Sequence, residues 1–130
     1  MKKLIPMLLL VGVSTNVLAK WTGIGKSPDG DTTIYIDFTT IRKHGDLVKM
    51  WHLYDFQTTK TASGIRYFSS KGQEEYDCKE EQSRALAFSM FFDKMGDGVA
   101  NYSGVVDSNW NPVSPGSIDE KLFKIACGIK

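Results

Sequence analysis

The chain has 130 residues, of which 24% are charged, and its 16 basic and 15 acidic side chains give a formal net charge of +1. Because the two signs are nearly balanced and interspersed, the composition argues against an electrostatic nucleic-acid binder. The two cysteines and an aromatic content of 12% are the features of the composition that call for an explanation.

The first residues match a cleavable secretory signal. Two lysines supply a positive start, residues 4–13 form a short apolar run, and small residues occupy the positions that a signal peptidase inspects before Lys20. We therefore expect cleavage between Ala19 and Lys20; the alternative is an uncleaved N-terminal helix. Residues 20–130 then form a single domain, because a second domain has no room.

The same region predicts where the product goes. A bacterial lipoprotein carries a cysteine at its cleavage point, whereas this chain has Lys20 there. No later segment approaches about 18 uninterrupted apolar residues, so we expect no membrane span. The prediction is an exported protein that is not a lipoprotein, either periplasmic or secreted to the cell surface.

Cys78 and Cys127 are the only cysteines. In an oxidising compartment paired thiols normally form a disulfide, which is the pairing we predict here. The alternative is two free thiols serving redox or metal chemistry, but the spacing is not CxxC and no histidine lies nearby in the sequence.

Apolar residues recur mainly with period two, which is typical of strands. Residues 21–26 and 32–38 flank the turn sequence Ser-Pro-Asp-Gly-Asp at 27–31 and predict a hairpin. Further strands are expected at residues 47–56, 65–70, 74–78 after a bend at 71–72, and 99–106.

The segment from Glu80 to Phe92 is ambiguous. Its first residues are good helix formers, which favours a helix. From Ala85 onwards, however, larger apolar residues alternate with smaller ones, and this alternation favours a strand with one apolar face. We favour the strand.

The C-terminal segment is expected to be a helix. Ser117 and Glu120 form a capping box, and apolar residues recur at helical spacing from Ile118 to Ala126. Together these elements predict an α+β fold: an antiparallel sheet of about six strands with a C-terminal helix, tied to it by one disulfide between Cys78 and Cys127.

A set of short motifs in this order resembles the bacterial surface-adhesin protein E family. The most specific are the pair Asp77-Cys78, the turn Pro115-Gly116-Ser117 and the cysteine at 127, and the likeness covers nearly the whole chain after the signal. The resemblance implies the same sheet, helix and bridge, and a non-catalytic binding module. It also implies attachment to host cells or extracellular-matrix proteins, although the founding adhesin is a lipoprotein.

Candidate chemistry is sparse. His44 and His52 stand in no metal-ligand spacing and are read as a turn and a strand residue. The aspartate pairs 29/31 and 93/97 are read as turn carboxylates rather than calcium ligands. We therefore expect no enzyme activity, no cofactor and no metal.

No binding surface can be assigned from the sequence. Trp51 and Trp110 are candidates for an exposed aromatic contact, but a core position is favoured for Trp51. The charged residues between 60 and 81 have mixed signs, which indicates a solvated surface rather than a basic patch.

Two functions follow from this reading. The leading hypothesis is an exported binding module with a protein partner, either a host matrix protein or an envelope protein. The alternative is a periplasmic inhibitor or accessory factor, for example of a cell-wall lytic enzyme. The edges of an open sheet also allow a homodimer.

Overall fold

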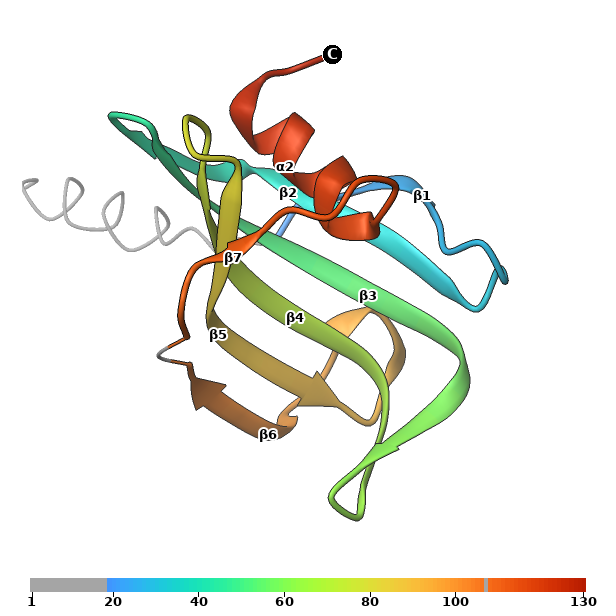
Figure 1. The fold of residues 1–130 in the computed structure, drawn as a ribbon. Coiled ribbons are helices and arrows are strands. Elements are labelled where there is room, and N and C mark those ends of the chain that lie inside the picture. The colour runs from blue at the N-terminus through green and yellow to red at the C-terminus, as the bar shows by residue number, and fades with distance from the viewer. Residues whose placement is uncertain (1–18, 107) are drawn as a thin grey trace, which may run out of the picture.

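Six antiparallel strands, each paired with the next along the chain, form one sheet, to which a short seventh strand adds beside the fifth (Figure 1). The structure, a computed structural model, describes residues 19–106 and 108–130. A C-terminal helix crosses one face of the sheet, so the α+β fold predicted from the sequence is confirmed. The elements are β1 (Trp21–Lys26), β2 (Thr32–His44), β3 (Leu47–Ala62), β4 (Ile65–Asp77), β5 (Gln82–Phe91), the short 3₁₀ turn η1 (Lys94–Gly96), β6 (Ala100–Val105), β7 (Asn111–Pro112) and α2 (Ile118–Cys127).

The strands differ from their predicted bounds in several places. β2 and β3 run on to His44 and Ala62, past the predicted ends at residues 38 and 56. β4 runs without a break through residues 71–72, where a bend was expected, because its backbone stays paired with β3 on one side and with β5 on the other. The two-residue strand β7, which pairs with the start of β5, was not predicted. The ambiguous segment after Glu80 is the strand β5, as favoured, because pairing with β4 and β6 outweighs the helix propensity of its first residues.

The helix α2 begins and ends at the residues that its sequence indicates. The hydroxyl of Ser117 accepts the N–H of Glu120 at 3.1 Å, and the Glu120 carboxylate accepts the N–H of Gly116 at 3.0 Å. At the other end Gly128 adopts the left-handed conformation, with φ of 69°, and its N–H returns to the last turn. These bonds satisfy backbone groups that a helix end leaves without partners.

The core lies between α2 and one face of the sheet, which we call the helix face. Alternate residues of each strand point to this face, so the period-two pattern of β2 and β3 becomes a continuous apolar layer. Full burial of each large side chain contributes about 1.5–3 kcal/mol. The fully or almost fully buried members are Ile34, Ile36, Val48, Met50, Tyr76, Leu122, Phe123 and Ala126.

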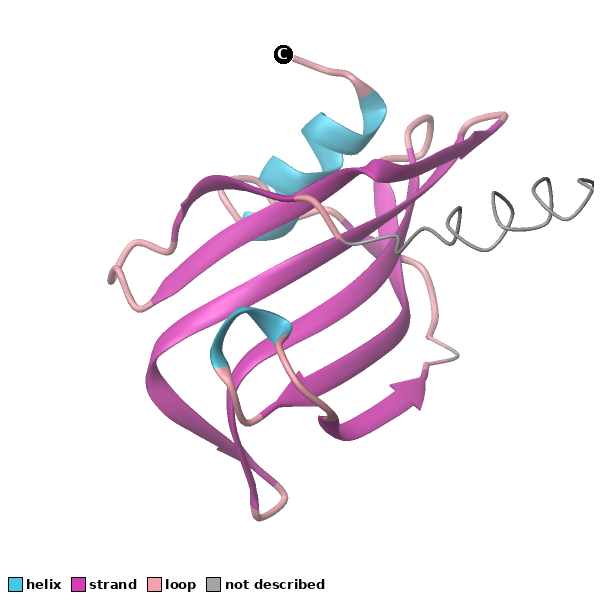
Figure 2. Ribbon diagram, turned by 180° about the vertical axis from the view of Figure 1, so that it is seen from behind, coloured by secondary structure: helices cyan, strands magenta, loops and turns pink. Residues whose placement is uncertain are grey.

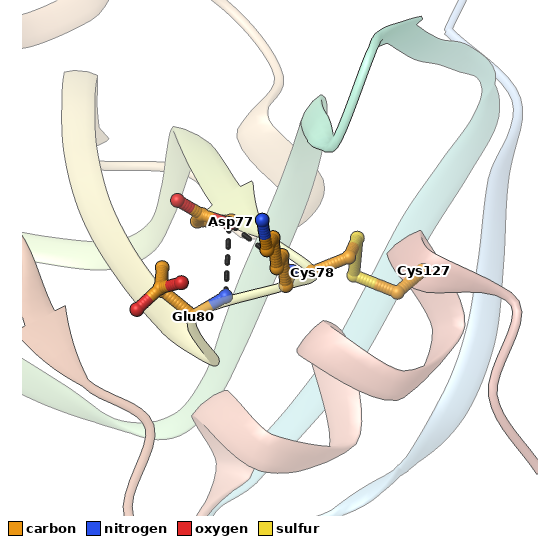
Figure 3. The surroundings of a disulfide bond; sticks show 5 residues. Asp77, Cys78, Glu80 and Cys127 are labelled. Atoms are coloured by element: carbon orange, nitrogen blue, oxygen red, sulfur yellow. Dashed lines mark hydrogen bonds between the residues drawn. A yellow bond between two sulfur atoms is a disulfide. The ribbon is translucent and has the colours of Figure 1, made fainter.

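A disulfide ties the helix to the sheet, as predicted. Cys78, directly after β4, is bonded to Cys127 at the end of α2, and the two residues are 49 apart in sequence (Figure 3). The Asp77 carboxylate accepts the N–H groups of Lys79 and Glu80 at 3.1 and 3.0 Å. This turn fixes the chain beside the bridge before it enters β5.

The opposite face of the sheet is partly covered by η1 (Figure 2). Ser69 donates to the carbonyl of Asp93 at 2.6 Å and accepts the N–H of Gly96 at 2.8 Å. The Asp55 carboxylate accepts the N–H of Met95 at 2.7 Å. These bonds hold the turn over the buried Leu53.

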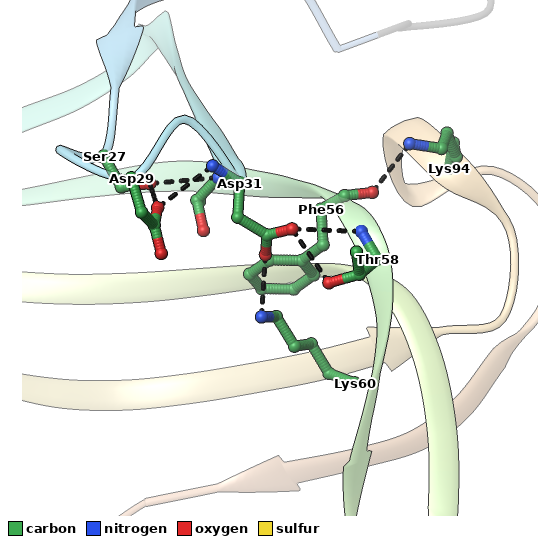
Figure 4. A network of polar contacts seen from close by, with 8 residues as sticks. Ser27, Asp29, Asp31, Phe56, Thr58, Lys60 and Lys94 are labelled. Atoms are coloured by element: carbon green, nitrogen blue, oxygen red, sulfur yellow. Dashed lines mark hydrogen bonds and ion pairs between the residues drawn. The ribbon is translucent and has the colours of Figure 1, made fainter.

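Hydrogen bonds fasten the β1–β2 turn to β3 (Figure 4). Asp29 accepts the hydroxyl of Ser27 at 2.6 Å, and this bond lowers the pKa of its carboxyl. Asp31 lies 2.7 Å from the ammonium of Lys60 and accepts the hydroxyl of Thr58 at 2.8 Å. Both aspartates therefore act as carboxylates that shape the turn.

Candidate binding groove

The part of the helix face that α2 leaves uncovered contains two adjoining hollows. The first, of about 290 Å³, lies over β3, β4 and β5, and the second, of about 360 Å³, reaches the N-terminal turn of α2. They share two residues, Glu74 and Ala85, and we call them together the groove. Its polar wall includes His52, Tyr54, Ser70, Glu74, Ser83 and Asp119, with Lys71, Arg84, Ser108 and Asn111 at its borders, and its apolar floor includes Ala85, Ala87, Phe88 and Met90.

His52 is buried in the wall of the first hollow, with 6% of its surface exposed. It lies on the same face of β3 as Met50 and Tyr54, and its ring stacks on Tyr54 with 4.5 Å between ring centroids. Burial lowers the pKa of His52 to about 4, so the imidazole is neutral at physiological pH. No described residue makes a hydrogen bond to its Nδ1 atom.

The position opposite His52 on β4 is Gly72. A Cβ atom placed there would lie 2.7 Å from two ring atoms of His52. The missing side chain therefore makes the space that the imidazole fills.

Glu74 and Asp119 bring negative charge to the second hollow from two elements. Burial, and then the charge of Asp119, raise the pKa of Glu74 to about 7. Asp119 accepts the hydroxyl of Ser83 at 2.7 Å. Burial together with these two carboxylates raises the pKa of Tyr54 and of Tyr76, so both phenols stay neutral.

None of the tryptophans lines the groove. Trp51 is half-buried rather than in the core, and lines a hollow of about 240 Å³ on the opposite face with Trp21 and Asp37. Trp110 packs against the guanidinium of Arg84, 4.6 Å from its ring centroid. Trp51 and Trp110 therefore do not form one aromatic contact.

Sequence reasoning missed the groove residues. His52 was read only as a strand residue, and Glu74 only as part of a solvated surface of mixed charge. Alternation places Glu74 on the same face as Tyr76, but no local sequence pattern indicates that α2 brings Asp119 beside Glu74.

The predicted cleavage point lies at the start of the described chain, where Ala19 and Lys20 are exposed. The rest of the predicted signal lies outside the described residues.

The described residues contain neither a metal-binding cluster nor a membrane-spanning helix. Within residues 19–106 and 108–130, no group of three or more His, Cys, Asp or Glu side chains is placed to hold a metal ion. In the same part of the chain, no helix has the length and apolar character needed to cross a membrane.

A single antiparallel sheet with one disulfide-tied helix across its face, and a groove beside that helix, defines a class of small α+β domains. The sequence model of surface-adhesin protein E matches residues 21–128. The chain therefore belongs to the surface-adhesin protein E family, which confirms the resemblance seen in the sequence. The family is one of adhesins, and thus indicates a binding protein that is exported or displayed at the cell surface.

Solved structures of Haemophilus influenzae protein E have the same fold. Crystal form II has a TM-score of 0.63 at 12% sequence identity, and the match covers 88% of this chain and 92% of that chain. A selenomethionine form has a TM-score of 0.60 at 12% identity, covering 88% and 91%. Protein E from a non-typeable strain gives 0.59 at 11% identity, covering 88% and 80%. No curated protein sequence matches the chain.

Proposed function

We propose that this chain is the precursor of an exported binding module without catalytic activity. In this proposal residues 1–19 are a signal removed before Lys20, and the domain that follows binds another protein. Membership of the surface-adhesin protein E family supports both export and binding.

The observation that carries the proposal is the groove. Buried polar atoms without hydrogen-bond partners cost free energy, so native chains rarely keep them without a reason. Here Nδ1 of His52 and the hydroxyl of Tyr76 have no partner among the described residues. Tyr76 lies in the core beneath α2, but His52 lines the groove, which favours a ligand supplied from outside the chain.

The partner that we propose first is a host or extracellular-matrix protein. Protease shaving of intact cells tests whether the domain can reach such a partner, with a C-terminal tag on the chain and a periplasmic protein as control. Loss of the tag with survival of the control supports surface display. Survival of both contradicts it and directs the search to periplasmic partners, beginning with inhibition of a cell-wall lytic enzyme.

Binding itself is tested with the purified domain on an immobilised basement-membrane extract. The variant Ala85→Trp fills the groove, whereas Lys49→Trp adds the same side chain at an exposed position on the opposite face of the sheet. We expect Ala85→Trp to abolish binding and Lys49→Trp to retain it. Equal binding by both variants would exclude the groove as the contact surface.

A second copy of the chain is a further candidate partner. β6 is an edge strand of the sheet, and Val99 and Val105 beside and within it are each 91% exposed. An exposed apolar edge can pair with the same edge of another molecule. Sedimentation velocity of wild type and Val105→Lys tests this: a dimer that the lysine dissociates supports it, and a monomeric wild type contradicts it.

A further inference from the structure

The groove has negative charge that no ion pair of the described residues balances. Three ion pairs occur among the described residues, and neither Glu74 nor Asp119 belongs to any of them. Asp119 has the Ser83 hydroxyl and the N-terminal turn of α2 beside it, which stabilise a negative charge without cancelling it. Glu74 lies half-buried close enough to Asp119 for the two charges to repel.

The basic residues that line the groove direct their charges elsewhere. Arg84 donates two hydrogen bonds, of 2.9 and 2.7 Å, to the Glu75 carboxylate. Lys71 holds its ammonium over the ring of Phe91, at 4.9 Å from the centroid, and near Trp21. Arg84 is thus paired with Glu75, and Lys71 lies against aromatic rings. Neither pairs with Glu74 or Asp119, so the groove keeps a net negative wall.

One buried polar group adds to this wall. His52 lines the first hollow with 6% of its surface exposed, and its Nδ1 atom has no partner among the described residues. The imidazole is neutral, so Nδ1 is a hydrogen-bond acceptor. The carboxylates of Glu74 and Asp119 and this nitrogen make a set of acceptors that suits a ligand rich in N–H donors.

The floor of the groove is apolar and consists of small and flexible side chains. Ala85, Ala87 and Met90 leave room for an aliphatic chain, and the stacked rings of His52 and Tyr54 offer a flat surface beside the carboxylates. An aliphatic stem that ends in a planar or compact cation complements both parts of this surface.

We propose that the groove binds a basic side chain, an arginine or a lysine, that the partner protein presents, with Glu74 and Asp119 pairing its charge. This inference rests on the proposed binding function and names the chemistry that the partner must offer. The floor holds the stem, and the rings of Tyr54 and His52 support a guanidinium. Arginine fits better than lysine because its planar fork can satisfy several acceptors at once.

A titration followed by two-dimensional NMR of the isotope-labelled domain, residues 20–130, tests the proposal. The probe is Nα-acetyl-arginine methylamide, and the matched control is the citrulline compound, which has nearly the same shape and no charge. We expect the arginine probe to shift resonances of residues 52–54, 72–74 and 85–90, and the citrulline compound to leave them unchanged. Binding of citrulline with equal affinity would overturn the role of charge.

Variants show whether binding of the arginine probe depends on the groove carboxylates or only on the overall charge of the domain. Glu74→Gln and Asp119→Asn should each weaken binding of the arginine probe at least fivefold, whereas Asp46→Asn, at an exposed turn, should leave it within twofold. Equal weakening by Asp46→Asn, or absence of shifts in wild type, would overturn the proposal. Because Asp119 also bonds Ser83, each variant must retain the folded spectrum. If Asp119→Asn does not, the result for Glu74→Gln decides whether the groove carboxylates bind the probe.

One further probe distinguishes a protein partner from free amines. If putrescine binds the groove and the arginine probe does not, the site belongs to small amines and the proposed partner side chain is wrong. The measurement uses the domain alone, so it can fail while the domain still binds a matrix extract elsewhere. It can also succeed when the matrix extract is not bound, which separates this inference from the proposed function.

Discussion

The imidazole of His52 lies against the backbone of Gly72 on the neighbouring strand, so closely that a Cβ atom at Gly72 would be 2.7 Å from the ring. Gly72→Ala should therefore displace the buried ring and destabilise the fold by about 1–3 kcal/mol, as overpacking does. Thermal unfolding measures this as a fall in Tm of roughly 5–20 °C.

Gly23→Ala is the matched control for this variant. Gly23 also lies in a strand, but there the new methyl group would meet Tyr35 at an ordinary 3.4 Å. We expect its Tm to stay within a few degrees of wild type or to rise. If Gly72→Ala behaves like Gly23→Ala, the ring has room to move and the tight packing is not a constraint.

The disulfide should contribute a large part of the stability. Cys78 and Cys127 close a loop across 49 positions, which restricts the unfolded chain by about 4 kcal/mol on the chain-entropy estimate. Replacing both cysteines with serine should lower Tm by well over 10 °C for a domain of this size. A melting curve shared by wild type and variant under oxidising conditions would contradict this.

The sequence predicts most of the sheet because its pattern is local. Alternation identifies β1, the first half of β2 and most of β3, and the capping box identifies where α2 begins. The alternation of β5 was visible but competed with a helical start, and only its pairing with two strands decides the outcome. The fold was therefore predictable to the extent that short-range patterns dominate it.

The groove could not be predicted because it depends on strand register and helix placement. Opposite Gln73 and Glu74 the partner on β5 skips from Ala87 to Ala85, so a bulge decides which residues of β5 lie beside Glu74. Asp119 comes close only because the disulfide and the core fix α2 over the sheet. These are long-range contacts between segments that no local sequence pattern connects.

Two groove residues should give opposite contributions to the pH dependence of stability. Glu74 has a folded pKa of about 7 against 4.5 unfolded, so stability falls as pH rises from 4.5 to 7. His52 has a folded pKa of about 4 against 6.5 unfolded, so stability rises as pH rises from 4 to 6.5. Between pH 4.5 and 6.5 the two effects oppose each other, and the wild type should show little net slope.

Glu74→Gln should reveal the contribution of His52. We expect the free energy of unfolding of this variant to rise between pH 5 and 6.5, and to exceed that of wild type at pH 8 by about 2 kcal/mol once solvent screening of the half-buried carboxyl is allowed for. Urea unfolding at each pH measures both quantities, with the exposed Glu80→Gln as control. A variant whose pH profile runs parallel to that of wild type would show that Glu74 titrates normally.

The predicted cleavage point lies beside a buried carboxylate. The backbone N–H of Lys20 donates to Oδ2 of Asp37 at 3.1 Å, and Asp37 is only 3% exposed. Burial raises the pKa of Asp37, but hydrogen bonds from Thr39 and Lys20 outweigh it and keep the pKa below its usual value. If cleavage follows Ala19, this nitrogen becomes a positively charged amine beside a buried carboxylate.

A domain that begins at Lys20 should therefore be more stable at pH 6 than one that begins at Ala19, by about 1 kcal/mol, because a charged donor bonds the Asp37 carboxylate more strongly than an amide does. Since the gain requires the protonated amine, it should be present below about pH 7.7 and be lost once the amine deprotonates at higher pH. Thermal unfolding of both forms at pH 6 and 9.5 measures the difference, and Asp37→Asn should remove it. Equal melting temperatures at pH 6 would mean that the new amine does not pair with Asp37, and that processing contributes nothing to the fold.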